Sequence, residues 1–407
     1  MSREFFATLT VAEALVGFRP TRRTAVETVA LADALRRVPA AAVPAPGPLP
    51  GFARSTVDGY AVRAADTYGA SEGLPSYLEL AGAVRMGAEP DVKVVPGAAV
   101  EMPTGGVLPP GSDAVVMVEY TQITMPGTIE VLRPVAPGAG VVRADEDVAA
   151  GADLVPAGRP LRAADLGILA AAGVVELEAH ARPRVVILST GDEVVAPSTV
   201  QLRPGQVRDA TAPALAGLVL DAGGSPVLGG IVPDDPSALS EVLDAAMRHA
   251  DLMVVSAGSS VGARDSTADA VAALAPPGIF CHGLAVKPGK PTLLADCAGI
   301  PVIGLPGNPL SALVVFRLVG VPLVWRIGGC PVPPPEPVTR GRLGRDLASE
   351  AGRLDVVQVR LVDGVAEPLF GASALLAVLT RADGYLVVPE PATGLDAGTE
   401  VEVTLYR

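Results

Sequence analysis

Runs of strand character alternate with runs of helix character between residues 181 and 330, and this alternation limits the fold more than any other feature of the sequence. RVVILST (184–190) and DLMVVSAG (251–258) are short apolar runs that end in small or polar residues, as buried strands do. TAPALAGLVLDAGG (211–224) and PSALSEVLDAAMRHA (236–250) have the spacing and the stop signals of helices. We therefore predict a doubly wound α/β domain, which is a parallel sheet with helices on both faces.

The helices of this region have recognisable start signals. We expect Thr211, Asp235 and Asn308 to cap its three main helices, and Pro309 occupies the first turn of the last one. Ligands of doubly wound sheets bind beside the carboxyl ends of the strands. The loops that follow the strands are therefore the places to look for a site.

The flanking regions have a different character. Residues 7–38 carry apolar side chains at three- and four-residue spacings, which predicts a helix. The proline-rich segment 41–53 is predicted to be extended. Residues 54–140 consist of β-branched runs divided by glycine and proline, which predicts a small all-β module. A short helix is expected to end at Gly173, and residues 339–407 again have strand character.

Charge and cysteine usage narrow the class of protein. The chain has 407 residues and a net charge of −13, so it repels the nucleic-acid backbone, and we expect no nucleic-acid partner. Its three cysteines form no C-x-x-C pair, which argues for a reducing compartment. The most apolar stretch, Leu310 to Trp325, is interrupted by Arg317 and Pro322 and is shorter than the roughly 18 to 20 residues of a membrane span. We expect a soluble cytoplasmic protein without a membrane partner.

Polar residues gather in the predicted loops. STGDEV (189–194) places Asp192 and Glu193 after one strand, and SAGSSVGARD (256–265) ends in an aspartate after another. Such oxygen-rich loops suit Mg²⁺, which takes one or two carboxylates together with substrate phosphate. Most surface carboxylates are only solvated, so each residue alone is weak evidence for a metal site.

Two further loops suit an anion. GLPGNP (304–309) leads into a helix N-terminus, where free amide groups and the helix dipole favour negative charge. AVKPGKP (285–291) sets Lys287 and Lys290 around a Pro-Gly turn, an arrangement that holds phosphate or another oxyanion. Taken alone, the first motif also fits a tight strand-to-helix turn, and the second also fits a solvated basic loop. The sequence contains no evident Ser-His-Asp set, GxGxxG motif or Walker A motif.

Taken together, these motifs resemble the molybdopterin molybdenumtransferase family, whose members include MoeA and the gephyrin E domain. The resemblance runs over nearly the whole chain, and its specificity lies in the order and spacing of short blocks. The matching blocks are STVDGYAV (55–62), PTGGVLPPGSDAVVMVE (103–119), VRADEDV (142–148), STGDEV (189–194), GQVRD (205–209), VPDDP (232–236), SAGSSVGARD (256–265), KPGKP (287–291) and GLPGNPLSA (304–312).

The resemblance implies a multidomain α/β plus β protein. Four domains are expected: an elongated discontinuous N-terminal domain (1–50 and 141–180), an inserted β domain (51–140), a MogA-like molybdopterin-binding α/β domain (181–330) and a C-terminal β-barrel domain (331–407). It also implies a homodimer in which each active site is built across the subunit interface.

The resemblance assigns roles residue by residue. The implied catalytic residues are Asp58, Thr104, Asp147, Glu193, Asp265 and Lys287. The implied binding residues for the pterin substrate are Gly258, Ser259, Ser260, Gly262, Lys290, Pro306, Gly307, Asn308, Pro309, Arg360 and Ser373. The implied Mg²⁺ ligands are Glu193, Asp234 and Asp265.

The reaction implied by the resemblance is insertion of molybdate into adenylated molybdopterin with release of AMP, giving molybdenum cofactor. Two other functions stay open at this point: a molybdopterin adenylyltransferase and a non-enzymatic pterin-binding scaffold or sensor. Departures from the family pattern, among them Gly283 in place of a lysine, leave the choice between molybdate and tungstate open. Transient contacts with the adenylyltransferase and with molybdoenzymes are expected.

Overall fold

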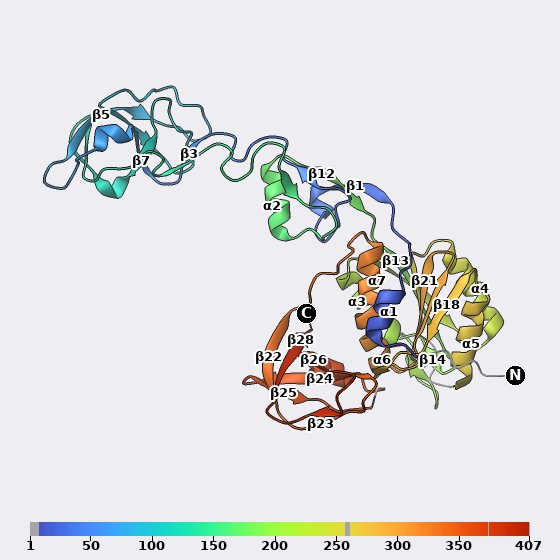
Figure 1. Ribbon diagram of the computed structural model, residues 1–407. Helices are drawn as coiled ribbons and strands as arrows, with labels where there is room; N and C mark the ends of the chain where they lie inside the picture. The colour runs from blue at the N-terminus through green and yellow to red at the C-terminus, as the bar shows by residue number, and fades with distance from the viewer. Residues whose placement is uncertain (1–7, 257–260, 373, 407) are drawn as a thin grey trace.

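Three lobes follow one another along an extended molecule (Figure 1). The computed structural model describes residues 8–256, 261–372 and 374–406, with the backbone alone for 261–265. A β lobe lies at one end, a slender lobe lies in the middle, and an α/β domain beside a β barrel forms the other end. The fold is therefore the predicted multidomain combination of α/β and β architecture.

The distal β lobe is built on a six-stranded sheet of order β7-β4-β6-β5-β9-β8. Its strands are β4 (Gly59–Val62), β5 (Ser76–Ala83), β6 (Ala98–Met102), β7 (Ala114–Met117), β8 (Thr121–Met125) and β9 (Thr128–Val131), with short 3-10 turns η2 (Ala64–Thr67) and η3 (Val118–Tyr120). Alternate residues of β4 enter different cores, because Tyr60 and Val62 belong to one cluster and Ala61 to another. The lobe is tied to the rest of the chain by β3 (Arg54–Ser55) pairing with β10 (Val141–Val142).

The middle lobe is made from segments far apart in the chain. Its strand pairs are β1 (Val26–Ala30) with β12 (Glu176–His180) and β2 (Val43–Pro44) with β11 (Asp153–Val155), and it also holds η1 (Leu31–Asp33) and helix α2 (Ala163–Ala171). Asp165 is buried at the start of α2, where Arg159 donates to both of its oxygens at 2.6 and 2.8 Å. Gly173 follows α2 with φ +77°, in agreement with the predicted helix stop.

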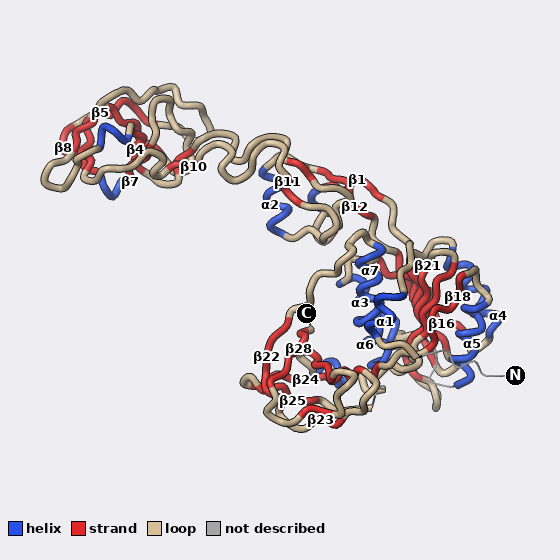
Figure 2. Tube along the Cα trace, viewed as in Figure 1, coloured by secondary structure: helices blue, strands red, loops and turns tan. Residues whose placement is uncertain are grey.

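The α/β domain contains a six-stranded sheet of order β16-β13-β17-β21-β20-β18. Its strands are β13 (Arg184–Thr190), β16 (Ser225–Val232), β17 (Leu252–Ser256), β18 (Pro277–His282), β20 (Leu293–Cys297) and β21 (Ile300–Leu305), and the short pair β14 (Val194–Val195) and β15 (Val207–Arg208) lies beside it. Helices α4 (Pro236–Met247) and α5 (Val261–Ala272) cover one face, while α3 (Thr211–Asp221) and a long apolar helix cover the other (Figure 2). The doubly wound prediction is confirmed, but one end of the sheet was not predicted: β20 pairs antiparallel with β21, and the edge strand β18 pairs antiparallel with β20.

The N-terminal helix is shorter than predicted. Within residues 8–38, α1 (Val11–Gly17) is the one α-helix, because Pro20 interrupts the chain and the following β-branched run forms β1. Val11, Ala14 and Phe18 pack into the core of the α/β domain, although residues 1–50 were expected in the elongated domain. The four-domain division itself stays a prediction.

A single apolar helix crosses one face of the α/β domain from Pro309 to Ile327. It consists of α6 (Pro309–Val315), a π turn η4 (Phe316–Gly320) and α7 (Val321–Ile327). The helix predicted to begin at Asn308 is present, and a π turn, which changes the hydrogen-bond spacing of the helix, lies just before Pro322. The helix is long and apolar enough to cross a membrane by length and composition, and 67% of its most apolar window is buried inside the protein. Its residues fill the domain core, as a buried core helix does.

The C-terminal region is a closed five-stranded barrel, as predicted. Its strands are β22 (Val338–Leu343), β24 (Leu354–Val362), β25 (Val365–Pro368), β26 (Gly384–Val388) and β28 (Glu400–Leu405), accompanied by β23 (Leu347–Ala348), β27 (Gly394–Leu395) and α8 (Ala377–Arg381). Closure comes from β26, which pairs with both β28 and β24. A strand of the preceding region, β19 (Val286–Lys287), joins the barrel by parallel pairing with β24.

Candidate functional site

A cavity of about 750 Å³ lies where the barrel meets the α/β domain, and we call it the Lys287 cavity. Three segments that are distant in sequence form most of its wall. They are the turn 284–291, the start of the apolar helix (Pro306, Asn308, Leu310, Ser311) and the barrel residues Arg353, Asp355, Gln358 and Phe370. The structure therefore brings the two predicted anion-binding motifs, KPGKP and GLPGNP, to one place.

The lysine turn is held by contacts with both domains. Lys287 lies opposite Asp355 in the β19–β24 pairing, so its position depends on the barrel. On the other side, a Cβ atom at Gly289 would lie 2.3 Å from Val315 Cγ2, so only glycine fits against the apolar helix. The turn is thus fixed between the two domains.

Charged groups in the cavity are arranged around one buried carboxylate. Asp355 is 4% exposed; Lys287 Nζ lies 3.5 Å from its Oδ2, and Arg353 Nε donates to its Oδ1 at 3.1 Å. Lys290 also lines the cavity, and Glu350 pairs with Arg353 at 2.9 Å. Cationic groups outnumber the carboxylates here, and cations with a helix N-terminus suit an oxyanion.

Gln358 is a cavity residue that the sequence analysis missed. Its side chain is almost fully buried and lines the cavity from β24. The Tyr406 hydroxyl donates to its Oε1, whereas its Nε2 has no hydrogen-bond partner among the residues that the structure describes. A buried donor without a partner is costly unless a ligand or water accepts its bond. No sequence signal marks a lone glutamine within a strand.

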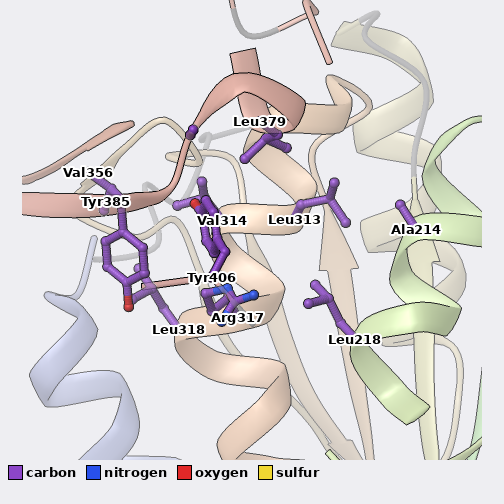
Figure 3. A pocket seen from close by; sticks show the side chains of 11 residues that line it. Ala214, Leu218, Leu313, Val314, Arg317, Leu318, Val356, Leu379, Tyr385 and Tyr406 are labelled. Atoms are coloured by element: carbon purple, nitrogen blue, oxygen red, sulfur yellow. The ribbon is translucent and has the colours of Figure 1, made fainter. Parts of the chain in front are cut away.

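Beside the cavity, an apolar pocket of about 240 Å³ joins the barrel to the apolar helix (Figure 3). The Arg317 guanidinium stacks over the Tyr406 ring at 4.7 Å, and Arg317 also pairs with Glu336. Tyr385 donates to Glu336 at 3.0 Å. Burial raises the pKa of Tyr406 to about 12 and also raises the pKa of Tyr385, which faces Glu336. These contacts hold in place the tyrosine that anchors Gln358.

Two of the three predicted magnesium ligands, Glu193 and Asp234, follow the carboxyl ends of β13 and β16. The Asp234 amide donates to Asp192 Oδ1 at 3.2 Å, and burial together with the charges of Glu193 and Asp192 raises the pKa of Asp234. Glu193 and Asp234 are therefore close, at the sheet edge that also carries GLPGNP. Within the described part of the chain, no group of three or more His, Cys, Asp or Glu side chains is arranged to hold a metal ion.

The three predicted helix caps differ in whether the structure shows the capping hydrogen bond. Asp235 caps α4 as predicted, by accepting from the amides of Ser237 and Ala238. The predicted cap Thr211 was wrong, since Asp209 accepts from the amides that begin α3 at 3.0 and 3.1 Å. Asn308 occupies the N-cap position of the apolar helix, but its side chain makes no capping hydrogen bond and instead lines the Lys287 cavity.

Asp58 and Thr104 meet in the distal β lobe. Asp58 Oδ1 accepts from the Thr104 amide at 2.7 Å and from its hydroxyl at 2.9 Å, and these bonds lower the pKa of Asp58. The Thr104 hydroxyl, in a residue of the implied catalytic set, therefore donates to this carboxylate. Within one chain the pair lies at the far end of the molecule from the Lys287 cavity (Figure 1).

Two further predicted residues, Asp147 and Arg360, are described by the structure and do not line the Lys287 cavity. Asp147 is exposed in the connection between the distal and middle lobes, where its amide donates to the Leu49 carbonyl at 3.0 Å. Arg360 is exposed on β24 opposite Glu367. Gly258, Ser259, Ser260 and Ser373 lie outside the described residues, as do the surroundings of Gly262 and the side chain of Asp265 within α5. Gly307 and Pro309 belong to the turn at the start of the apolar helix.

The lobes, the barrel and a cationic cavity at the edge of a doubly wound sheet define a class of molybdopterin-related proteins. Three family profiles match the chain: MoeA N-terminal region (domain I and II) at residues 8–173, probable molybdopterin binding domain at 186–326, and MoeA C-terminal region (domain IV) at 340–406. The chain belongs to the MoeA family.

Relatives match the chain over most of its length. A protein named molybdopterin molybdenumtransferase 2 from Mycobacterium tuberculosis is 34% identical over 401 residues, covering 97% of this chain and 96% of the relative. A molybdopterin molybdenumtransferase from Nostoc is 35% identical over 364 residues, covering 87% of this chain and 83% of the relative. The crystal structure of a molybdopterin biosynthesis MoeA protein from Pyrococcus horikoshii OT3 superposes with a TM-score of 0.85 at 29% identity, covering 98% of this chain and all of that one.

Proposed function

We propose that the protein is a molybdopterin molybdenumtransferase, which inserts molybdate into adenylated molybdopterin and releases AMP. Relatives named for this activity match almost the full chain. The observation that carries the proposal is the Lys287 cavity, where Lys287, Lys290, Arg353 and the free amide of Gln358 converge in a chain of this family. The cavity provides cationic and neutral donors for an oxyanion, which the reaction requires.

The cavity residues have distinct roles in this proposal. Lys287 and Lys290 neutralise the negative charge of molybdate or of the phosphate linkage. Asp355 positions Lys287 from the barrel side. Gln358 donates through Nε2 to an oxyanion, with Tyr406 holding its orientation. Asn308 contributes a side-chain amide at the same wall.

Mg²⁺ fits the carboxylates at the neighbouring sheet edge. Burial, followed by the charges of Glu193 and Asp192, raises the pKa of Asp234, and a bound cation would offset both effects. Two carboxylates with substrate phosphate oxygens make a typical Mg²⁺ site, and Asp265 is the proposed third ligand. The ion would supply charge neutralisation at the phosphate linkage of the pterin substrate.

A second copy of the chain completes the site in this proposal. Asp58 and Thr104 lie in the distal lobe, at the other end of the molecule from the cavity of their own chain. Their predicted catalytic role requires that the lobe of one protomer reach the cavity of the other. A homodimer of this kind is proposed, as are a cytoplasmic location and transient contacts with molybdopterin adenylyltransferase and molybdoenzymes.

AMP release tests the function directly. Purified protein is incubated with adenylated molybdopterin and Mg²⁺, with molybdate, with tungstate or with neither oxyanion. Oxyanion-dependent AMP release with metal-bearing product is expected, and the better oxyanion identifies the metal. The control is Arg340→Gln, which removes an exposed barrel arginine far from the cavity lining. Tight pterin binding without turnover under any of these conditions would instead support a scaffold or sensor.

A further inference from the structure

Three arginines converge on a pocket of about 360 Å³ at the junction between the lobes. Arg19, Pro20, Thr21, Arg23, Arg326 and Pro331 line it, and we call it the arginine pocket. Its volume falls in the range of about 300–1,000 Å³ that is typical of small-molecule sites. Three cations and no carboxylate line this pocket in a chain whose net charge is −13.

The three guanidinium groups are not neutralised by carboxylates. Arg19 donates to the Val16 carbonyl at 3.0 Å, Arg23 to the Arg22 carbonyl at 2.8 Å, and Arg326 to the Phe18 carbonyl at 3.3 Å. Among the described residues, none of the three forms an ion pair. The neighbouring Arg22 is different, because it pairs with Asp251 at 2.9 Å and does not line the pocket.

Arg326 supplies an independent indication of a ligand. It is 9% exposed, and its Nε has no hydrogen-bond partner within the described parts of the chain. Burial, followed by the charges of Arg19 and Arg23, lowers the pKa of Arg326. A buried charged donor without a partner is strongly unfavourable, and a bound anion would satisfy it.

The pocket lies where three segments of the chain meet. Arg19 and Arg23 belong to the connection from α1 to β1, Arg326 lies in the last turn of the apolar helix, and Pro331 begins the linker to the barrel. The Lys287 cavity touches the first turn of the same helix. Since the helix has 19 residues, the two sites are separated by its length, about 28 Å at 1.5 Å per residue.

We propose that the arginine pocket is a second anion site, which binds a tetrahedral dianion such as a phosphate group, separately from the Lys287 cavity. Guanidinium groups are suited to tetrahedral oxyanions because their planar donor pairs reach two oxygens at once. The anion bridges the α1–β1 connection and the end of the apolar helix. This proposal does not depend on the transferase reaction.

Isothermal titration tests the site with inorganic phosphate, molybdate and AMP, each in chloride buffer of constant ionic strength. The test variant is Arg19→Gln/Arg23→Gln, which removes the two exposed arginines of the pocket. The matched variant is Arg22→Gln/Arg340→Gln, which has the same net charge and keeps all three pocket arginines. We expect phosphate binding to weaken about tenfold for each pocket arginine removed, and to change little in the matched variant. Lys287→Gln should retain this binding.

The outcomes separate the alternatives. The three anions are compared in the Lys287→Gln protein, so that binding in the Lys287 cavity is weakened. In that protein, tighter binding of AMP identifies a phosphate ester as the source of the anion, and tighter binding of phosphate or molybdate identifies a free oxyanion. The proposal is overturned if wild-type protein binds none of the three anions, if both double variants weaken binding equally, or if Lys287→Gln alone abolishes it. The thermal midpoint of each variant is measured without anion, and a midpoint equal to that of wild type shows that the substitutions leave the fold intact.

Discussion

The distal lobe and the Lys287 cavity both contain predicted catalytic residues, but the two regions differ in whether their polar groups have hydrogen-bond partners. In the distal lobe, Asp58 and Thr104 satisfy each other and lie at the surface. In the cavity, Gln358 is buried with an unused donor, and Lys287 shares its carboxylate with Arg353. The contrast indicates that the cavity is incomplete without a ligand, whereas the distal pair is already ordered without one.

Because of this difference, we expect substitutions in the two regions to affect activity and stability differently. A satisfied surface pair can dock onto another surface as a rigid unit, and its loss should affect activity without affecting folding. A cavity with unsatisfied donors gains stability from its ligand, because binding to the folded state alone raises stability. Substitutions in each region therefore separate catalysis from stability.

The largest expected effect follows from Lys287→Gln. This change removes the cation of the turn while keeping a side chain of similar length. We expect kcat for AMP release to fall by about 10²–10³, as when one donor to a developing oxyanion is removed. Arg340→Gln is the charge-matched control. Activity within threefold of wild type would remove Lys287 from the catalytic set.

Asp58→Asn is expected to have the next largest effect, in a region far from the cavity of its own chain. The variant keeps the shape of the side chain but loses the charge that accepts both Thr104 donors. We expect AMP release to fall about tenfold or more, in line with loss of an acid–base or positioning group. The thermal midpoint should not change measurably. Mixing the Asp58→Asn and Lys287→Gln proteins tests whether the two regions act across a subunit interface. In a heterodimer, the intact Lys287 of one chain would then meet the intact Asp58 of the other, and AMP release would partly return.

Gln358→Leu tests the unused donor. The leucine removes Nε2 from the cavity wall, and we expect KM for molybdate to rise about tenfold to a hundredfold, as for one lost hydrogen bond to a charged group. Tyr406→Phe deletes the hydroxyl that orients Gln358 but leaves Nε2 in place, so a smaller rise in KM is expected for it. A KM for Gln358→Leu equal to that of wild type would mean that Gln358 does not bind the oxyanion.

Asp165→Asn should affect stability alone. Arg159, together with Arg162, lowers the pKa of Asp165, so its contribution to stability is present above the unfolded value of 3.8 and is lost as the pH falls. We expect the variant to be less stable by about 1–3 kcal/mol in urea at pH 7. The difference from wild type should shrink as the pH is lowered below about 4. Unchanged AMP release is expected, and a loss of activity would tie the middle lobe to the site.

The sequence predicted those parts of the site that are local. KPGKP and GLPGNP were identified because a glycine turn with lysines and a strand-to-helix turn act through neighbouring residues. Arg353, Gln358 and the arginine pocket were missed because each depends on segments joined only by tertiary packing. The antiparallel strands β18 and β20 were missed for the same reason, as their pairing follows from the sheet edge and not from a hydrophobic period.

The order in which parts of the chain can fold during synthesis is a consequence of the pairing of β1 with β12 and of the packing of α1. The distal lobe is nearly continuous in sequence and can fold as soon as it emerges, because its strands β4 to β9 pair only with one another. Val26, however, pairs with His180, so the middle lobe must wait for the second half of its sheet. Helix α1 waits longer still, since Leu9 bridges to Leu284 and its apolar face is covered only by the α/β core. Helix α1 is thus synthesised early and buried late, and its apolar face stays exposed in the nascent chain until the α/β core has formed.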